Sequence, residues 1–474
     1  MNDAVDLGTT LGELAREDDR PSPRLAAFDA VEARLAADVR AGRLSPFVRT
    51  RFRTRAASLQ YRLAAADARE DEVARAATDL ERELRAGATT ALAAARPRAR
   101  PASAGARTAT KDVVIVGGGI VGLAAARQLA RAGVRVVVIE RGEIGGEASG
   151  RNGGQISPGI DATWAPLAKR ALDLWPDFAR ELGDIDYQCA GGLYVVMESD
   201  PIDPVDVLEY RRERGFVAEA LDASACRRLL PSLTDRIKGG VFSPRHGQVD
   251  PVKTMRALAR SARACGVDLW SNEEVTVIDV SAGAFRGVRT PRRHVAADVV
   301  LIAAGAWSGA LARQAGVDLP VSPRRIQIIA SEPTERMTDT LWGGNGLYSR
   351  QNSAGELHFG AEGPPWDPSV ETFERRTTEP TLRRIARRMV ELTPGLRGLR
   401  AKRAWSGIIG PSADGQPIID VIEEPSGLAL ATGFGGNGFG TGPASGEAIA
   451  ELILTAATSV DTTAMRLERF RAPS

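Results

Sequence analysis

The sequence predicts an α/β protein preceded by a helical segment. Two observations favour this fold class. From residue 112 onward, short apolar runs with the composition of buried strands alternate with helical patterns, as in strand–helix–strand units. The first 110 residues are rich in Ala and Arg, contain no lysine or cysteine, and have apolar residues that recur at helical spacing.

The first 94 residues predict an all-α helical hairpin. Pro23 and Pro46 each follow a serine, which pairs an N-cap residue with a proline suited to the first helical turn. We expect helices over residues 23–40 and 46–85, each ending close to a glycine. Extensions of this kind serve oligomerisation or packing more often than catalysis. A homo-oligomeric contact through these helices is therefore the expectation.

Residues 95–111 predict a linker, because they combine Pro, Ala, Gly and Arg without periodicity. Composition excludes several functions for the chain. Lys and Arg number 62 against 60 Asp and Glu, so the basic excess that nucleic-acid binding requires is missing. The three cysteines and three histidines stand far apart, which argues against a metal site. No apolar run is long enough to span a membrane, and we expect a cytoplasmic protein.

A glycine-rich turn between the first strand and helix of the α/β region indicates a dinucleotide site. Gly117, Gly119 and Gly122 form a G-x-G-x-x-G pattern in this strand–turn–helix context. The glycines permit the tight turn, the approach of a diphosphate and close helix–strand packing. The diphosphate is expected at the helix N-terminus, where Ile120 and Val121 begin the first turn.

The second strand of this unit ends in an acidic residue suited to a ribose. Glu140 is placed to accept hydrogen bonds from the adenosine ribose hydroxyls, and Arg141 follows it. A second stretch rich in glycine and small residues comes next, at residues 142–159. Such a stretch is expected to run close to a large ligand.

Several motifs taken together resemble those of the FAD-dependent D-amino-acid oxidase family, which includes glycine oxidase, sarcosine oxidase and dimethylglycine-type enzymes. The resemblance covers about residues 112 to 455 and does not extend to the first 110. In order along the chain, the motifs are ASGRNGG (148–154), GQVDP (247–251), AAGAWS (303–308), GELHFGAE (355–362), RAWSGIIGPSADGQPIID (403–420) and ATGFGGNGFGTGPASGEAIAEL (431–452).

The resemblance implies two interleaved domains after the N-terminal extension. One is a Rossmann-like FAD-binding domain of α/β type, formed by residues 112–160, 246–320 and 403–474. The other is a mixed α+β substrate-binding domain with a large antiparallel sheet, formed by residues 161–245 and 321–402.

The resemblance also implies which residues bind FAD beyond the first glycine turn. Position 155 is a glutamine and residues 404–410 contain no cysteine, so FAD is expected to be bound non-covalently. The implied residues are Ser149, Arg151, Asn152, Gly153, Gly154 and Gln155 along the diphosphate and flavin ring, Val275 at the adenine, Ala304, Gly305 and Trp307 in a second motif, Gly407, and Gly435, Gly436, Asn437 and Gly438 beside the pyrimidine end.

The implied reaction moves a hydride from a carbon bearing an amine to flavin N5. The resulting imine hydrolyses to a carbonyl compound and an amine or ammonia, with oxygen the expected acceptor. Such substrates usually carry a carboxylate, for which arginine is the natural partner. Many relatives place that arginine shortly after a Trp-x-Gly motif. Here Ile408 and Ile409 follow Gly407, so the sequence departs from the family pattern.

Other residues are therefore candidates for substrate binding and catalysis. Arg350, with Tyr348 two residues away on the same strand face, is one candidate anchor, and Arg325 beside Arg324 is another. Trp405 and Asn437 complete the expected substrate contacts. His358 stands where sarcosine-oxidase-like relatives can hold a lysine that promotes the reaction with oxygen, a role that requires a protonated imidazole.

Two other functions stay open. The same fold can oxidise the C–OH group of a 2-hydroxy acid, in which case no amine or ammonia would be released. Alternatively, the chain is a flavoprotein subunit that acts only with a partner docked on the N-terminal helices.

Overall fold

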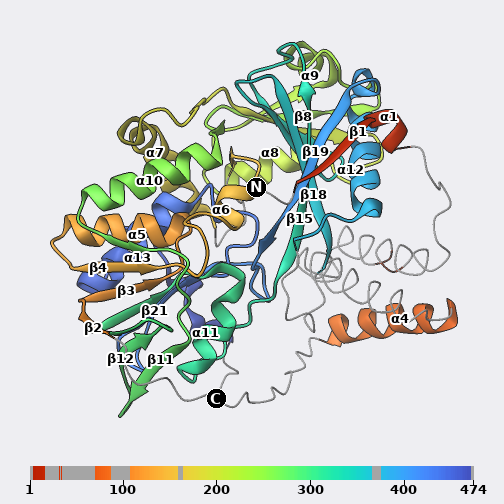
Figure 1. The fold of residues 1–474 in the computed structure, drawn as a ribbon. Helices are drawn as coiled ribbons and strands as arrows, with labels where there is room; N and C mark the ends of the chain where they lie inside the picture. Colours follow the sequence, from red (N-terminus) through yellow and green to blue (C-terminus); the bar gives the residue numbers. More distant parts are fainter. Residues whose placement is uncertain are drawn as a thin grey trace. The chain divides into compact units, whose positions relative to one another are not determined.

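The computed structural model describes residues 4–15, 31, 34, 70–86, 107–157, 164–365 and 375–470 (Figure 1). The chain divides into two compact units. The larger comprises Met1–Ala15, Ser103–Glu362 and Glu374–Ser474, and the smaller comprises Arg16–Ala102 and Gly363–Phe373. All the sheets that position the site belong to the larger unit.

A six-stranded sheet forms the nucleotide-binding half of the larger unit. Its first five strands pair in parallel, and β20 joins the edge antiparallel. The four inner strands, β4, β3, β14 and β21, consist almost entirely of Val, Ile, Leu and Ala and are buried on both faces, as expected of a parallel sheet. In sheet order they are β10 (Asp268–Trp270), β4 (Val136–Ile139), β3 (Val113–Val116), β14 (Val299–Ile302), β21 (Leu428–Thr432) and β20 (Ile418–Ile422).

Successive residues of these strands pack against different layers. Val113 and Ile115 of β3 join a core formed with helices, whereas Val114 and Val116 join a core formed with a second sheet. Figure 1 shows the helices grouped on one side of β3 and β4. The helices are α5 (Ile120–Arg131), α7 (Ala165–Leu182), α10 (Pro251–Ala264) and α13 (Gly442–Thr455). The second sheet comprises β11 (Val277–Ser281), β12 (Ala284–Arg289), β13 (Arg293–Ala296) and β2 (Arg107–Thr110), with α11 (Ser308–Gln314) nearby.

A nine-stranded sheet forms the other half of the larger unit. Among the neighbouring strands whose register the structure describes, β16 and β6 are parallel and all other pairs are antiparallel. One face packs on α12 (Glu379–Leu392), where Leu357 and Phe359 meet Ile385 and Met389. In order, the strands are β1 (Val5–Thr10), β19 (Arg400–Ile409), β15 (Arg324–Pro333), β18 (Glu356–Pro365), β17 (Leu347–Gln351), β16 (Leu341–Gly344), β6 (Gly192–Met197), β8 (Ile237–Ser243) and β7 (Glu219–Asp222).

Short elements complete the larger unit. A two-stranded ladder joins β5 to β9 and holds residues that follow the ASGRNGG motif. The short elements of the larger unit are α1 (Leu11–Leu14), α6 (Ala148–Arg151), β5 (Gln155–Ile156), α8 (Pro204–Glu213), α9 (Ala223–Leu229), β9 (Gly247–Gln248) and the 3₁₀ turns Gly305–Trp307, Pro394–Leu396, Thr463–Met465 and Leu467–Phe470.

The beginning of the chain corrects the prediction that residues 1–94 are a helical extension. Val5–Thr10 is a strand, β1, that pairs antiparallel with β19 at the edge of the nine-stranded sheet. Thr10 and Glu13 then form a capping box, and Leu11 is fully buried. Gly8 has a left-handed backbone, φ +54°, and lies in a register shift between Asp6 and Thr9, where the sequence also departs from the apolar–polar alternation that indicates a strand.

Two further boundaries differ from those predicted. Strand β2 lies within the predicted linker, where it pairs in parallel with β13. Helix α7 lies in a segment predicted for the substrate domain, yet its Leu167, Ala171 and Trp175 pack in the core of the six-stranded sheet. Both elements depend on partners that are distant in sequence.

The smaller unit contains part of the predicted hairpin. Helix α4 spans Glu70–Ala86, near the end of the second predicted helix, and Arg34 of the first is helical. Arg34 Nη2 lies 2.7 Å from Glu81 Oε2, so an ion pair joins the two predicted helices. The rest of the hairpin lies outside the described residues. In the described part of the chain, none of the helices has the length and apolarity to span a membrane.

Candidate active site

A cavity of about 450 Å³ lies where the strands of the six-stranded sheet end, and we call it the dinucleotide cavity. Its walls come from the ends of β3, β4 and β14, the α6 segment and the turn after β21. Fifteen of the predicted cofactor residues line it: Gly117, Gly119, Ile120, Val121, Glu140, Arg141, Ser149, Asn152, Val275, Ala304, Gly305, Trp307, Gly435, Gly436 and Gly438.

At the N-terminus of α5, the glycine turn packs its backbone closely against other backbone segments. Gly117 has φ +117°, and a Cβ there would collide with the carbonyl oxygen of Ala303. A Cβ at Gly122 would collide with the carbonyl oxygen of Gly117, so this glycine serves packing rather than the cavity wall. The Ile120 amide donates to Ser149 Oγ at 3.0 Å, which places a polar side chain at the positive end of the helix.

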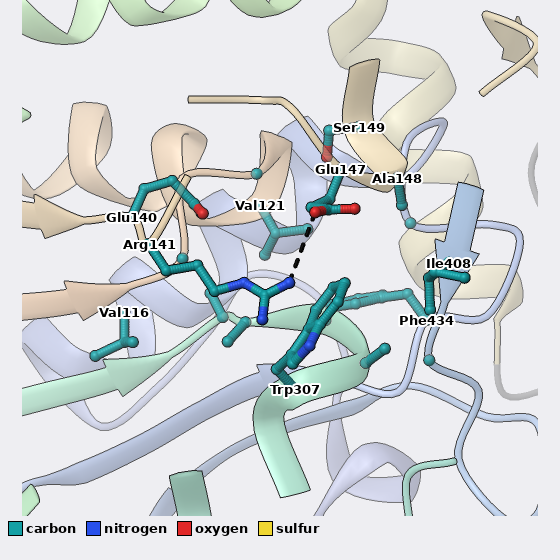
Figure 2. A pocket seen from close by; sticks show the side chains of 18 of the residues that line it. Val116, Val121, Glu140, Arg141, Glu147, Ala148, Ser149, Trp307, Ile408 and Phe434 are labelled. Carbon is teal, nitrogen blue, oxygen red and sulfur yellow. Dashed lines mark ion pairs between the residues drawn. The ribbon is translucent and has the colours of Figure 1, made fainter. Parts of the chain in front are cut away.

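Glu140 fixes the loops around it through both carboxylate oxygens. The backbone amides of Gly118 and Gly142 each donate to it at 2.8 Å. Arg141 points into the cavity, where its guanidinium stacks on Trp307 at 3.9 Å from the ring centre (Figure 2). An ion pair of 3.6 Å links Arg141 Nη2 to Glu147 Oε1.

Residues 151–155, which we call the 151–155 loop, are fastened to the nine-stranded sheet by side chains. Arg151 Nε donates to the Ser406 carbonyl at 2.8 Å, and Trp405 Nε1 donates back to the Arg151 carbonyl at 2.9 Å. Gln155 Nε2 donates to the Ser349 carbonyl at 2.9 Å. Arg350 Nε donates to the Gly153 carbonyl. Strands β17 and β19 of the same sheet therefore both position the loop.

Four predicted side chains share the face of the sheet that meets this loop, and we call them the sheet face: Tyr348, Arg350, His358 and Trp405. The register pairs Arg350 with His358 and Tyr348 with Gly360, and paired residues point to the same side. The Tyr348 ring lies against Gly153 and Gly360. The rings of His358 and Trp405 meet edge to face, with centroids 5.4 Å apart.

Arg350 is a buried cation with few partners. Only 3% of the residue is exposed, and among the described residues its one hydrogen bond is the Nε contact with Gly153. Burial lowers the pKa of Arg350 to about 10, although Asp250, Asp186 and Glu356 oppose the shift. The guanidinium therefore remains charged at neutral pH and keeps donors for an anionic ligand.

His358 is buried and neutral at neutral pH. Its Nε2 lies 3.3 Å from Glu356 Oε2. Burial lowers the pKa of His358, and the charges of Arg350 and Arg403 add to this effect, although Glu356 opposes it. The hydrogen bond with His358, together with Arg403 and Lys402, holds the pKa of Glu356 far below its usual value. The protonated imidazole that the predicted oxygen role requires is therefore disfavoured.

Comparison with known proteins decides the family. The FAD dependent oxidoreductase model of the DAO family matches residues 112–452. The chain belongs to this family. It is 30% identical to a glycine oxidase of Pseudomonas putida over 364 residues, covering 74% of this chain and 97% of that protein. It is 32% identical to sarcosine oxidase subunit beta of Rhizobium meliloti over 377 residues, covering 76% and 88%.

Solved structures agree with this assignment. Glycine oxidase from Geobacillus kaustophilus superposes with a TM-score of 0.71 at 26% identity, over 77% of this chain and 100% of that one. L-proline dehydrogenase from P. horikoshii superposes with a TM-score of 0.70 at 26% identity, over 77% and 98%. The predicted family, fold class, FAD dependence and oxidoreductase activity are confirmed.

The dinucleotide cavity of this DAO-family chain fits FAD. Its volume lies in the range of ligand sites, and the Gly117 turn leaves no space for a side chain where a diphosphate would approach. Gly119 gives α5 no side-chain cap, so amides of its first turn can serve an anion. The described lining contains neither cysteine nor histidine, which agrees with non-covalent attachment.

The closing glycine turn of the family lies at the other wall. Gly435 has φ +53°, and Phe434 and Phe439 flank it in the lining. Asn437 does not line the cavity. Instead its backbone amide donates to the Phe434 carbonyl at 3.0 Å, and its backbone carbonyl accepts from the Thr441 amide at 3.1 Å. Asn437 therefore shapes the turn that leads into α13.

Sequence reasoning missed several lining residues. Glu147, the residue directly before the ASGRNGG motif, reaches into the cavity beside Arg141, as Figure 2 shows. Its Oε2 is buried without a hydrogen-bond partner among the described residues, and burial raises the pKa of its carboxyl. Ile408 and Ile409 also line the cavity, in the stretch where the family arginine is missing. Nothing in the local pattern identifies Glu147, whereas the position of the isoleucines after the Trp-x-Gly motif is a signal that could have identified them.

One predicted substrate residue lies elsewhere. Arg325 alternates with Ile326, which packs toward Trp405 and Tyr348, so Arg325 points to the opposite side of the sheet. There its Nη1 donates to the Arg376 carbonyl at 2.6 Å. Gly407 instead approaches the 151–155 loop, where a Cβ would lie 3.5 Å from Arg151 Cβ. Arg325 is thus not brought together with Arg350.

Proposed function

We propose that this chain oxidises the C–N bond of an amino acid or N-substituted amino acid and that oxygen reoxidises its flavin. The product is an imine that hydrolyses to a carbonyl compound and an amine or ammonia. Relatives named glycine oxidase, sarcosine oxidase subunit beta and L-proline dehydrogenase support this substrate class. FAD, when bound, supplies the hydride acceptor.

The buried guanidinium of Arg350 carries the proposal. It lies against Gly153, in the loop that the family places along the flavin, and no carboxylate of the described residues forms an ion pair with it. An unpaired buried cation is costly unless a ligand neutralises it. A substrate carboxylate is the ligand that matches its remaining donors.

The other residues of the sheet face complete the site. With Nε2–H donated to Glu356, His358 retains a lone pair on Nδ1, which is buried without a partner among the described residues. We assign this atom to accept a hydrogen bond from the substrate amine, in place of the cationic role expected from sequence. Tyr348 and Trp405 bound the same space with their rings and exclude water.

Anaerobic reduction of the bound flavin tests the proposal. The FAD-loaded protein is mixed with glycine, sarcosine, L-proline, D-alanine and the matched 2-hydroxy acids, and the flavin absorbance is followed. We expect at least one amino acid to bleach the flavin, with release of amine or ammonia, and air to restore the colour. Bleaching by hydroxy acids alone would contradict the C–N assignment, and colour that does not return in air would contradict oxygen as the acceptor.

A further inference from the structure

A second, smaller cavity shares no lining residue with the dinucleotide cavity and has three cationic side chains in its wall. Its volume is about 130 Å³, which holds a few waters at roughly 30 Å³ each and is too small for a nucleotide. Its wall includes Lys169 and Asp173 of α7, Arg211 of α8, and Arg245 and His246 of the turn after β8. The proposed function uses none of these residues.

Arg211 is the buried residue of this cavity. It is only 7% exposed, and its Nη1 donates to the Ser243 hydroxyl. Its Nε is buried with no hydrogen-bond partner, and among the described residues no carboxylate forms an ion pair with it. A buried guanidinium without a counter-ion is costly, so an anion bound beside Arg211 would stabilise it.

The other charged groups of the wall increase this deficit. Lys169 is exposed, and its ammonium lies against Gly215 without a carboxylate partner among the described residues. Arg245 lies 2.6 Å from Asp173, which is the one carboxylate in the lining. Two positive charges therefore remain uncompensated at one small cavity, whereas the formal net charge of all 474 residues is only +2.

His246 adds a neutral polar group to the wall. Its Nδ1 lies 3.2 Å from Ser157 Oγ, and burial together with the charge of Arg211 lowers the pKa of His246 to about 3. A neutral imidazole contributes no charge at neutral pH. It can still hydrogen-bond an oxygen of a ligand.

We propose that this second cavity binds a small oxyanion, either inorganic phosphate or a short carboxylate, with Arg211 at its base and Lys169 and Arg245 at its rim. The guanidinium and ammonium donors match the oxygens of such an anion. The site is independent of the proposed reaction. Its occupant would contact the turn that leads into β9, whose next residue, Val249, donates to the Gly154 carbonyl at 2.9 Å.

Calorimetric titration of the FAD-loaded full chain tests this site. FAD fills the other place where phosphate would bind, and sodium chloride keeps the ionic strength constant. We expect phosphate or acetate to bind with one-to-one stoichiometry. Sulfate, titrated as a third arm, is expected to follow phosphate if the site takes tetrahedral anions, and binding of acetate alone would assign a carboxylate.

Variants locate the bound anion. Lys169→Met removes an exposed cation of the rim and is expected to weaken binding at least about tenfold. Arg260→Met, on the exposed side of α10, removes the same charge outside the lining and is expected to leave affinity unchanged. Arg211→Met is expected to abolish binding. Unchanged affinity in Lys169→Met, or no uptake of any of the three anions by the parent, would overturn the proposal.

Discussion

The dinucleotide cavity and the sheet face are built by different means. The cavity is formed largely by backbone and glycine: Gly117 is pressed against Ala303, and the first amide of α5, that of Ile120, donates to Ser149 Oγ. The sheet face is formed by side chains of β17, β18 and β19, and Trp405 and Arg350 fasten the 151–155 loop to it.

This difference determines how each region responds to substitution. A backbone-built site fails when a side chain is added, because the backbone atoms around it cannot move aside. A side-chain-built site loses one hydrogen bond at a time, and each loss costs about 1–3 kcal/mol when it leaves a buried group unpaired. We therefore expect large effects in the cavity and graded effects on the sheet face.

The largest effect is expected from Gly117→Val. The new side chain would collide with Ala303 and cannot adopt φ +117° without strain, so FAD affinity should fall at least about 100-fold. Gly133→Ala is the matched control, because Gly133 also has a positive φ, +85°, but faces open space. Fluorescence titration with FAD measures both. Near-parent FAD affinity in Gly117→Val would contradict the backbone account of the cavity.

Trp405→Phe should give an intermediate effect. An aromatic ring remains at the position, but the Arg151 carbonyl loses its 2.9 Å hydrogen bond, at a cost of about 1–3 kcal/mol in stability. Trp164→Phe removes a comparable bond, from Nε1 to the Gly415 carbonyl at 3.3 Å, outside the 151–155 loop. Denaturant unfolding should show a loss in both variants. Only Trp405→Phe should also shift the absorbance spectrum of bound flavin. If the two variants have the same flavin spectrum, Trp405 does not position the 151–155 loop beside the flavin.

Glu147→Gln should give the smallest effect and the opposite sign. Burial raises the pKa of the Glu147 carboxyl, so its deprotonation costs free energy in the cavity, and a diphosphate there would add repulsion. The FAD affinity of the parent should therefore weaken as pH rises through this raised pKa. At pH 8 the glutamine variant should bind FAD about three- to tenfold more tightly, with a flatter pH profile.

Glu143→Gln is the charge-matched control for Glu147→Gln, because Glu143 is exposed and does not line the cavity. Its FAD affinity should follow that of the parent at every pH. If both glutamine variants tighten FAD binding equally, the effect is one of net charge and not of the cavity.

The sequence predicted the cavity better than the sheet face for a physical reason. The G-x-G-x-x-G turn and Glu140 lie within one strand–helix–strand unit, so local spacing fixes their geometry. The pairing of Arg350 with His358 was compatible with the sequence, but the fastening of Arg350 to Gly153 joins residues 197 positions apart. Local patterns cannot specify such a contact.

Strand β1 and Arg325 illustrate the same limit. Residues 5–10 form a strand because the β19 edge is available to them, and their own pattern, broken by Gly8, gives no such signal. Arg325 shares its sequence environment with Arg324, and only the register with β19 shows that it faces away from Trp405. Register, which tertiary contacts set, decided both outcomes.

Arg350 is proposed to anchor a substrate carboxylate beside the 151–155 loop. Its most direct test is anaerobic flavin reduction by the best amino acid and by the matched amino alcohol, in the parent and in Arg350→Gln. We expect the parent to prefer the amino acid strongly. The variant should retain FAD but lose most of this preference, by about 100-fold or more. A variant that keeps the preference of the parent would show that Arg350 does not bind the substrate carboxylate.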